Sequence, residues 1–522
     1  MQPRTHRTTT ASLTTRRAVG GAFFLALALA ASAEADDWTN SGGNAGRNSA
    51  VQSPSPATAN LRWSSARSSL ISWLPVTDGT SVYTVRQPKW PYQQPNDAYV
   101  VAMDLVTGAE RWAVVLPYVS GDWIPWVGGV NGGRVYCSRS GNGASVSAKL
   151  YALDAIDGHT LWSSVALQNA GSYDGMVFAP DGDPIVASFQ DIWRFNAEDG
   201  TTVWHATRVG SVSGNCGGAL FGNAFYVADA VAGGHAIVRY DATTGARLYQ
   251  SELMPGFTIQ NTPMVGPDGT VYLNRAQNNV SVDFYYAFTD TGSGFLLKWK
   301  VAGMSGAGAE LGVGPGGSVY VITPGPKLAR LDPSNGAVLN ETAVLSGFLS
   351  ARFAIDRVGR VYFSNGGAAA GRLYAYEEDL TPRWNVAVAN INIGGPTLAA
   401  DGTLIVSGPG TDFRAYYTPT TDAPELLSLR DDAAPFAAPN PFDRETSIRF
   451  SLPHGGPIAL DLFDASGARV RRLIAGEDLT SGQHAVRWDG RADDGRQLAN
   501  GVYFLRLMSS GVSTSGRVLL TR

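Results

Sequence analysis

The residue types that most often carry chemistry are sparse in this sequence, and their spacing predicts no catalytic or metal site. His159 and His205 lie inside or just after a repeated Trp-containing motif, and His235, His454 and His484 are scattered along the chain. No pair of histidines or cysteines has the spacing of a zinc motif, and no Gly-x-Ser-x-Gly elbow of a serine hydrolase occurs. We therefore expect no bound metal ion and no catalytic residue.

Two short motifs imitate ligand sites, but their surroundings argue against that use. Residues 312–317 match G-x-G-x-x-G, yet a strand pattern follows where a dinucleotide-binding turn requires a helix. Asp489, Asp493 and Asp494 crowd one loop with a spacing unlike that of an EF-hand. A hairpin turn and a solvated turn are the simpler interpretations.

Clustered aromatic residues offer the remaining binding chemistry. Trp73, Trp123 and Trp126 occur in segments that lead into predicted strands, and Trp90 and Tyr92 occur in a Pro-rich insertion. Aromatic rings beside small polar residues can stack on sugars or hold peptide segments. These five residues are the candidate ligand-binding set, and the alternative is that their rings pack loops.

Composition and charge narrow the class of protein. The 522 residues include 61 glycines and 28 prolines, 44% are hydrophobic and only 16% are charged. This apolar content can fill a large core and heptads are absent, so wholesale disorder and a helical bundle are both excluded. The formal net charge of -4 gives no electrostatic footprint for nucleic acid. We expect a large all-β protein that binds no nucleic acid.

The N-terminus has the order of a secretory signal. Four arginines precede an apolar run over residues 18–30, and small residues then allow cleavage after residue 33 or 35. We assign residues 1–33 to a signal peptide, and the Arg16-Arg17 pair leaves both the Sec and the twin-arginine routes open. No later segment has an apolar run long enough to span a bilayer. We expect an exported chain in the medium or on the outer cell surface, with the periplasm as the alternative.

An internal repeat organises residues 61–420. Its second half reads aliphatic-x-Asp-x-x-x-Gly-x-x-x-Trp, and successive Trp positions lie 40 to 50 residues apart. Four short strands fit this spacing, which is the size of a propeller blade. Its first half is a turn with the positive φ that tight hairpins need, followed by a short strand. This first half occurs eight times: DGTSVY (78–83), NGGRVY (131–136), DGDPIV (181–186), GNAFYV (222–227), DGTVY (268–272), GGSVY (316–320), VGRVY (358–362) and DGTLIV (401–406).

The two ends of the repeat region complement each other. The segment LRW at 61–63 is a Trp strand without a preceding half, and the last repeat has no Trp strand after it, so we predict that both join in an eighth blade. The pattern resembles the PQQ-like propeller family and its tryptophan docking motif. The resemblance implies that one aromatic residue per outer strand packs between neighbouring blades, with Asn340 as a weakened position: Trp63, Trp112, Trp162, Trp204, Tyr249 (also weakened), Trp299 and Trp384.

Two further segments flank the predicted propeller. Residues 36–60 form a lead-in, and the Pro- and Ala-rich residues 421–439 form a linker to residues 440–522, whose alternation predicts a small Ig-like β-sandwich. The ordered segments from NPF (440–442) to RVLLTR (517–522) resemble the FlgD Ig-like domain and the type A sorting domain of type IX secretion. The resemblance implies sorting or anchoring, with the export machinery as a partner. The alternative is a domain that only packs or spaces.

The quinoprotein dehydrogenases share the propeller repeat, and the resemblance implies adjacent cysteines and a calcium site in those enzymes. Here Cys137 and Cys216 fall in different predicted blades, and two unpaired buried thiols are the simpler interpretation. We therefore predict a secreted or cell-surface, non-enzymatic binding or scaffold module that is monomeric, holds no cofactor and binds an unidentified protein or glycan partner. A quinoprotein-type, PQQ-dependent oxidoreductase or a carbohydrate-active propeller is the alternative.

Overall fold

The computed structural model describes most of the chain between residues 37 and 521. The described residues are 37–65, 67, 74–87, 98–117, 122–141, 147–168, 176–210, 213–214, 216–254, 259–260, 262–275, 282–304, 310–345, 352–364, 371–388, 395–408, 413–418, 435–438, 440, 442–452, 456–464, 468–480, 482–509 and 512–521. The predicted signal peptide and residues 421–434 of the predicted linker lie outside them. All regular elements of this part are strands, and no helix in it is long and apolar enough to cross a membrane.

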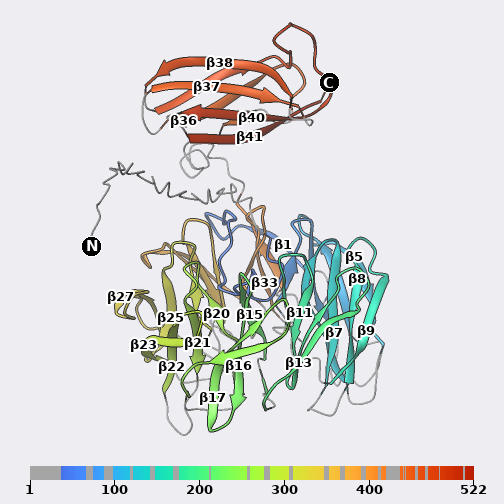
Figure 1. Cartoon of the computed structure of the whole chain (residues 1–522), viewed down its shortest axis with the longest axis vertical. Coiled ribbons are helices and arrows are strands. Elements are labelled where there is room, and N and C mark those ends of the chain that lie inside the picture. Colours follow the sequence, from blue (N-terminus) through green and yellow to red (C-terminus); the bar gives the residue numbers. More distant parts are fainter. Residues whose placement is uncertain are drawn as a thin grey trace, which may run out of the picture. The chain divides into compact units, whose positions relative to one another are not determined.

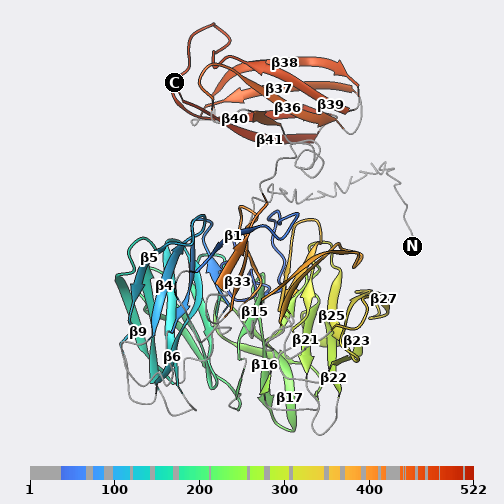
Figure 2. The same cartoon turned by 180° about the vertical axis from the view of Figure 1, so that it is seen from behind.

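Eight four-stranded antiparallel sheets form the propeller, which confirms the predicted fold (Figures 1 and 2). In seven blades the strands pair in chain order. Blade 1 has β2 (Val76–Thr77), β3 (Ser81–Arg86), β4 (Tyr99–Asp104) and β5 (Glu110–Val114), and blade 2 has β6 (Asp122–Asn131), β7 (Arg134–Gly141), β8 (Ser147–Asp154) and β9 (Thr160–Gln168). Blade 3 has β10 (Met176–Phe178), β11 (Pro184–Ala187), β12 (Asp191–Phe195) and β13 (Thr202–Thr207), and blade 4 has β15 (Gly218–Phe221), β16 (Ala224–Val231), β17 (Gly234–Asp241) and β18 (Arg247–Gln250).

The next three blades continue the same order. Blade 5 has β20 (Met264–Val265), β21 (Val271–Arg275), β22 (Val282–Asp290) and β23 (Phe295–Met304), and blade 6 has β24 (Gly312–Val313), β25 (Val319–Thr323), β26 (Lys327–Leu331) and β27 (Val338–Glu341). Blade 7 has β28 (Arg352–Ile355), β29 (Val361–Ser364), β30 (Arg372–Tyr376) and β31 (Pro382–Ala387). A separate parallel pair joins β14 (Ser213–Gly214) to β19 (Ile259–Gln260).

Blade 8 closes the ring with strands from both ends of the repeat region. It contains β32 (Thr397–Leu398), β33 (Leu404–Ser407), β34 (Phe413–Tyr416) and, as its outer strand, β1 (Leu61–Ser64). Trp63 of β1 stands opposite Ala415 of β34 in the antiparallel register. The predicted closure is therefore confirmed, and it leaves the ring without an open sheet edge at the seam.

Glycine determines where the first hairpin of each blade turns. Every one of the eight turns contains a glycine with φ between 57° and 93°: Gly79, Gly132, Gly182, Gly222, Gly269, Gly317, Gly359 and Gly402. Residues with a Cβ rarely adopt this region, so the repeated glycines fix the hairpin positions. The strand after each turn is buried, as in β29, where all four residues are inaccessible.

The predicted lead-in is an N-terminal plug (residues 37–56) that contacts all eight blades near the first hairpin turns. Six of its carbonyls accept hydrogen bonds from N–H groups of the inner strands of six blades. Figures 1 and 2 show this N-terminal segment in blue. The hydrogen bonds, from blade 1 to blade 8, are Thr77 N–H to Trp38 O (2.9 Å), Val130 N–H to Thr39 O (2.8 Å), Arg47 Nη1–H to Met176 O (3.4 Å), Leu220 N–H to Ala45 O (2.8 Å), Val265 N–H to Gly46 O (2.8 Å), Val313 N–H to Asn48 O (2.9 Å), Ile355 N–H to Ser49 O (2.7 Å) and Ala400 N–H to Asp37 Oδ1 (3.4 Å).

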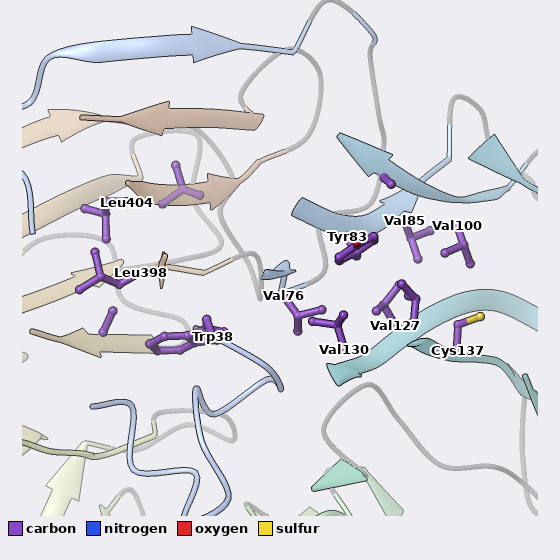
Figure 3. Close-up of a cluster of buried hydrophobic side chains, with 14 of the residues drawn as sticks. Trp38, Val76, Tyr83, Val85, Val100, Val127, Val130, Cys137, Leu398 and Leu404 are labelled. Atoms are coloured by element: carbon purple, nitrogen blue, oxygen red, sulfur yellow. The ribbon is translucent and has the colours of Figure 1, made fainter. Parts of the chain in front are cut away.

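The plug satisfies inner-strand groups that would otherwise face the channel without a partner. An unpaired buried N–H group costs about 1–3 kcal/mol, so these bonds favour the closed ring. The indole of Trp38 is fully buried in the same segment. Figure 3 shows it beside Leu398 of blade 8, with Val76 and Val130 of blades 1 and 2 across the cluster. One end of the channel is thus closed by the chain itself.

The C-terminal domain is the predicted β-sandwich. One sheet contains β35 (Phe436–Ala438), β36 (Thr446–Leu452) and β39 (Gly482–Trp488), and the other contains β38 (Arg469–Leu479), β37 (Gly456–Phe463), β40 (Gly501–Ser509) and β41 (Val512–Leu520) in that order. The inward residues of both sheets, Trp488 among them, form one buried core. β35 begins inside the predicted linker, because its Phe-Ala-Ala sequence has no alternation by which a strand could be recognised.

We expect Trp38→Ala to lower the free energy of unfolding by about 3–5 kcal/mol, because it leaves an indole-sized cavity where the plug meets blades 1, 2 and 8. Ile156→Ala removes a side chain that is 86% exposed and should change stability by less than about 0.5 kcal/mol. Denaturant unfolding of both variants measures the difference. Equal, small losses would mean that the plug does not support the ring.

Candidate functional site

An indole-to-carbonyl hydrogen bond joins neighbouring blades at five interfaces. In each case the indole N–H of an outer-strand tryptophan donates to a backbone carbonyl in the next blade. The carbonyl belongs to the residue that follows the motif Asp, or the Asn that replaces this Asp in blade 3. The pairs are Trp63 to Leu105 O (2.9 Å), Trp112 to Ala155 O (3.1 Å), Trp162 to Ala197 O (2.9 Å), Trp204 to Ala242 O (2.9 Å) and Trp299 to Pro333 O (3.0 Å).

The motif glycine makes room for each of these rings. A Cβ built on it would lie within 3.0 Å of the docked indole at all five interfaces: Gly108, Gly158, Gly200, Gly245 and Gly336. Any side chain at these positions would therefore displace the ring. The ring and the bare glycine backbone together fill the space between two blades.

The remaining three interfaces depart from this arrangement. Trp384 contacts Tyr362 and Tyr416, but its Nε1 has no hydrogen-bond partner, because β34 and β1 come from opposite ends of the chain and no motif turn joins them. Asn340 lies on β27, where all four residues are exposed. Tyr249 replaces tryptophan between blades 4 and 5, and this departure changes the interface most.

At the interface of blades 4 and 5 a carboxylate takes the place of the docking carbonyl. Tyr249 donates its hydroxyl to Asp290 Oδ1 (2.6 Å), and Tyr226 donates to Oδ2 (2.7 Å). The Gly292 N–H also bonds to Asp290 (2.8 Å), and Arg239 Nη1 lies 3.3 Å from the carboxylate. This network joins the two blades through polar groups, and the ring of Phe295 in blade 5 packs against Tyr226 and Tyr249 beside it.

A cavity of about 440 Å³ opens beside this network. A Cβ on Gly292 or Gly294, the turn glycines of blade 5, meets no atom within 4 Å, so no ring is docked on these glycines. The cavity between blades 8 and 1, where Trp63 is docked, measures only about 110 Å³. The residues around the larger cavity are Phe221, Asn223, Ala224, Tyr226, Arg239, Asp268, Gly269, Thr270, Thr289, Asp290, Gly292 and Lys298.

Hydrogen bonds and charges hold the ionisable groups of this cavity far from neutral titration. Burial by itself raises the pKa of Asp290, but the Tyr249, Gly292 and Tyr226 hydrogen bonds and Arg239 outweigh it and lower the pKa below its ordinary value. Asp268 behaves likewise, since Thr270 and Lys298 (3.6 Å) outweigh its burial. Burial and the neighbouring Asp290 raise the pKa values of Tyr226 and Tyr249. The carboxyls therefore stay ionised and the hydroxyls protonated at neutral pH.

The sequence carried a signal for this cavity that was interpreted only as a weakened repeat. Four of the five docked tryptophans stand opposite an alanine of the neighbouring strand, whereas Trp204 stands opposite Arg194 and Tyr249 opposite Arg239. The tyrosine in the ring position, and not the arginine across from it, therefore distinguishes this interface. Asp268, Asn223 and Lys298 carried no signal, because they meet only when the two blades come together.

The aromatic candidate set is not brought together among the described residues. Trp73, Trp90 and Tyr92 lie outside them, and Trp123 stands on β6 with a side chain outside them. Trp126 is 1% exposed and packs in a core cluster with Tyr136, so its predicted role in ligand binding is corrected to a core role. Its ring packs with Met176, Val186 and Phe195 of blade 3, between the two blades.

Buried charges at other inner-strand positions are already paired. Asp229 lies 3.8 Å from Arg208, with both side chains fully buried, and Glu310 forms an ion pair with Arg352. Burial raises the pKa of Asp229. Within the described ranges, three metal-type ligands gather only at Asp154, Asp157 and His159, an outer turn of blade 2 where the last two residues are exposed, and we assign no site to this turn.

The comparisons with protein families agree with the architecture. The family model described as outer membrane protein assembly factor BamB matches residues 47–299, 188–344 and 237–416, which together exceed half of the chain. The FlgD Ig-like domain model matches residues 441–511. Both resemblances predicted from the sequence are therefore confirmed. A search of curated proteins gave no match.

Solved structures share the fold at low identity. A europium-containing methanol dehydrogenase is 13% identical, with 72% of this chain and 90% of that one covered and a TM-score of 0.50. BamB from Moraxella catarrhalis is 17% identical, with 60% of this chain and 83% of that one covered and a TM-score of 0.39. PorZ of Porphyromonas gingivalis, called a surface component of the type-IX secretion system, is 14% identical, with 86% of this chain and 69% of that one covered and a TM-score of 0.37.

The quinoprotein likeness is one of fold, and the residues described here do not fit the PQQ cofactor. Cys137 on β7 and Cys216 before β15 are buried cysteines in different blades, so they do not form the adjacent pair that the resemblance implies. The buried acids Asp229 and Glu310 are held by arginines.

Repairing the docking position should close the cavity. We expect Tyr249→Trp to change the free energy of unfolding by less than about 1 kcal/mol, because packing of the indole above Gly292 offsets the lost hydrogen bond to Asp290. The reverse change at the neighbouring interface, Trp204→Tyr, should lower it by about 1–3 kcal/mol. Denaturant unfolding measures both variants. Equal destabilisation by the two substitutions would show that the cavity is not a missing ring.

Proposed function

Because the chain belongs to the family described as outer membrane protein assembly factor BamB, we propose that it is an exported β-propeller that binds a partner and catalyses no reaction. The place of action is the outer cell surface or the medium, with the periplasm as the alternative. The Ig-like domain serves sorting or anchoring through the export machinery. The N-terminal secretory pattern supports export.

The fixed protonation states and the volume of the cavity between blades 4 and 5 support the binding proposal. A general acid or base works best with a pKa near the working pH, but here the carboxyl pKa values of Asp268 and Asp290 are lowered and that of Tyr226 is raised. Groups held in one protonation state offer fixed hydrogen bonds, which suits recognition. The cavity volume of about 440 Å³ falls within the usual range of ligand sites.

The experiment for binding is co-sedimentation of the purified mature chain with envelope fragments from the producing cells. We expect the wild type to sediment with the fragments and Tyr249→Trp, with its cavity filled, to bind at least tenfold more weakly. Trp204→Ala is unsuitable as a control because it damages an interface, so the control is Leu248→Ala, an exposed residue of β18.

Two results would contradict the binding proposal. If wild type and Tyr249→Trp sediment equally, the cavity is not the binding site. If mass spectrometry shows that the fragments are chemically altered during incubation, the chain is an enzyme of the carbohydrate-active or quinoprotein type.

The sorting proposal has a surface of its own on the Ig-like domain. Val502, Phe504 and Met508 of β40 are 42–47% exposed on one face of the four-stranded sheet. Arg472 donates two hydrogen bonds to Asp461. The arginines that lie near the three apolar side chains on this face are Arg469, Arg472, Arg506 and Arg517. An exposed face of apolar and arginine side chains is a common basis of protein contact.

We expect Arg506→Glu to keep the wild-type melting temperature but to accumulate several-fold in the periplasm. Arg487→Glu on β39, whose side chain is 82% exposed, is the matched control and should be exported normally. Fractionation of periplasm, outer membrane and medium, with the intact mass of each form, measures the effect. A surface form that ends near residue 435 supports a removed sorting domain, whereas full-length periplasmic protein in the wild type contradicts the sorting role.

A further inference from the structure

We propose that the cavity between blades 4 and 5 binds an uncharged saccharide. This inference rests on the proposed binding function and names the ligand class for the same cavity. Three properties of the cavity wall carry it: its charges cancel, its polar groups both donate and accept, and one half-exposed aromatic ring borders it.

The charges of the wall are paired within the wall. Arg239 lies 3.3 Å from Asp290, and Lys298 lies 3.6 Å from Asp268, so two cations and two carboxylates balance. A phosphate or a carboxylate ligand would compete with these carboxylates for the cations. An ammonium ligand would compete with the cations for the carboxylates. An uncharged ligand keeps both pairs and adds hydrogen bonds to them.

The polar groups around the opening suit hydroxyl groups that donate and accept. Asp268 is an acceptor and bonds Thr270 (2.8 Å), whose hydroxyl also lies 3.2 Å from Lys298 Nζ. Asn223 is exposed; its amide donates to Asp241 (2.7 Å) and accepts from Thr243 (2.8 Å), and a second N–H and a second lone pair remain. A sugar hydroxyl can bond a carboxylate as donor and an ammonium or amide as acceptor at once. Few other uncharged ligands use such a mixed wall fully.

Phe221 supplies the apolar part of the site. Its side chain is 45% exposed at the end of β15, and its ring lies against the backbone of Gly269, where a Cβ would come within 3.1 Å. The glycine of the blade 5 turn thus keeps the ring flat against the turn and leaves its outer part open. A half-exposed aromatic ring offers a surface on which the C–H face of a pyranose can stack.

The site is preformed by rigid elements. Phe221 and Lys298 stand on strands, and Asp268 lies in a tight turn that its own bonds to Thr270 fix. Groups held on strands and tight turns lose little freedom on binding. The cavity therefore needs no closing segment to recognise its ligand.

The test is isothermal titration of the full mature chain with glucose, galactose, mannose and N-acetylglucosamine and their two- to four-unit oligomers. Inorganic phosphate and free lysine serve as ionic probes. We expect at least one saccharide to bind, with the affinity reduced tenfold or more in Phe221→Ala and in Asp268→Ala. Lys300→Ala, on the same strand as Lys298 but outside the cavity wall, should stay within twofold of the wild type.

The results that overturn the inference differ from those that overturn the proposed function. Binding of phosphate or lysine, but of no saccharide, would assign the cavity to charged ligands. A saccharide that binds equally well to Phe221→Ala and Asp268→Ala would place its site elsewhere. If no probe binds while envelope co-sedimentation persists and is lost in Tyr249→Trp, the ligand class is wrong but the binding function stands. If co-sedimentation also fails, both are wrong.

Discussion

The hydrogen bond from an outer-strand indole to a carbonyl of the next blade is the interaction on which the ring depends. It recurs at five interfaces, and each time a glycine of the next blade lies under the ring. One side chain thereby fixes both the distance between two blades and the path of the next turn. Three interfaces depart from this arrangement, and at the one with Tyr249 the tyrosine donates to Asp290, which borders a polar cavity.

The plug adds a second constraint that acts on all blades at once. The docking bonds join neighbours only, whereas residues 37–56 reach all eight inner strands or turns. At that end of the ring, backbone carbonyls of the plug are bonded to the inner strands of six blades. The candidate site therefore lies at the boundary of two blades and not in the channel.

The fold was predictable because its signals are local and repeated. Turn glycines with positive φ and the aromatic spacing gave eight blades, and the unmatched LRW segment gave the closure. The plug was not predictable, because six of its eight bonds to the blades run from backbone to backbone and leave no periodic side-chain pattern in residues 37–56. The cavity was half visible in Tyr249. Its remaining residues come from strands and turns of two successive blades, which only the folded ring brings together. Trp126 was mistaken for a ligand residue since alternation alone does not reveal which face of β6 is inward.

The most direct test of the account is hydrogen–deuterium exchange of the mature chain with and without envelope fragments from the producing cells. The account predicts slower exchange in residues 221–226, 268–270 and 289–298, which border the cavity between blades 4 and 5. Unchanged exchange there, with protection confined to the segments that carry Trp73 and Trp123, would contradict it and return the binding site to the aromatic set.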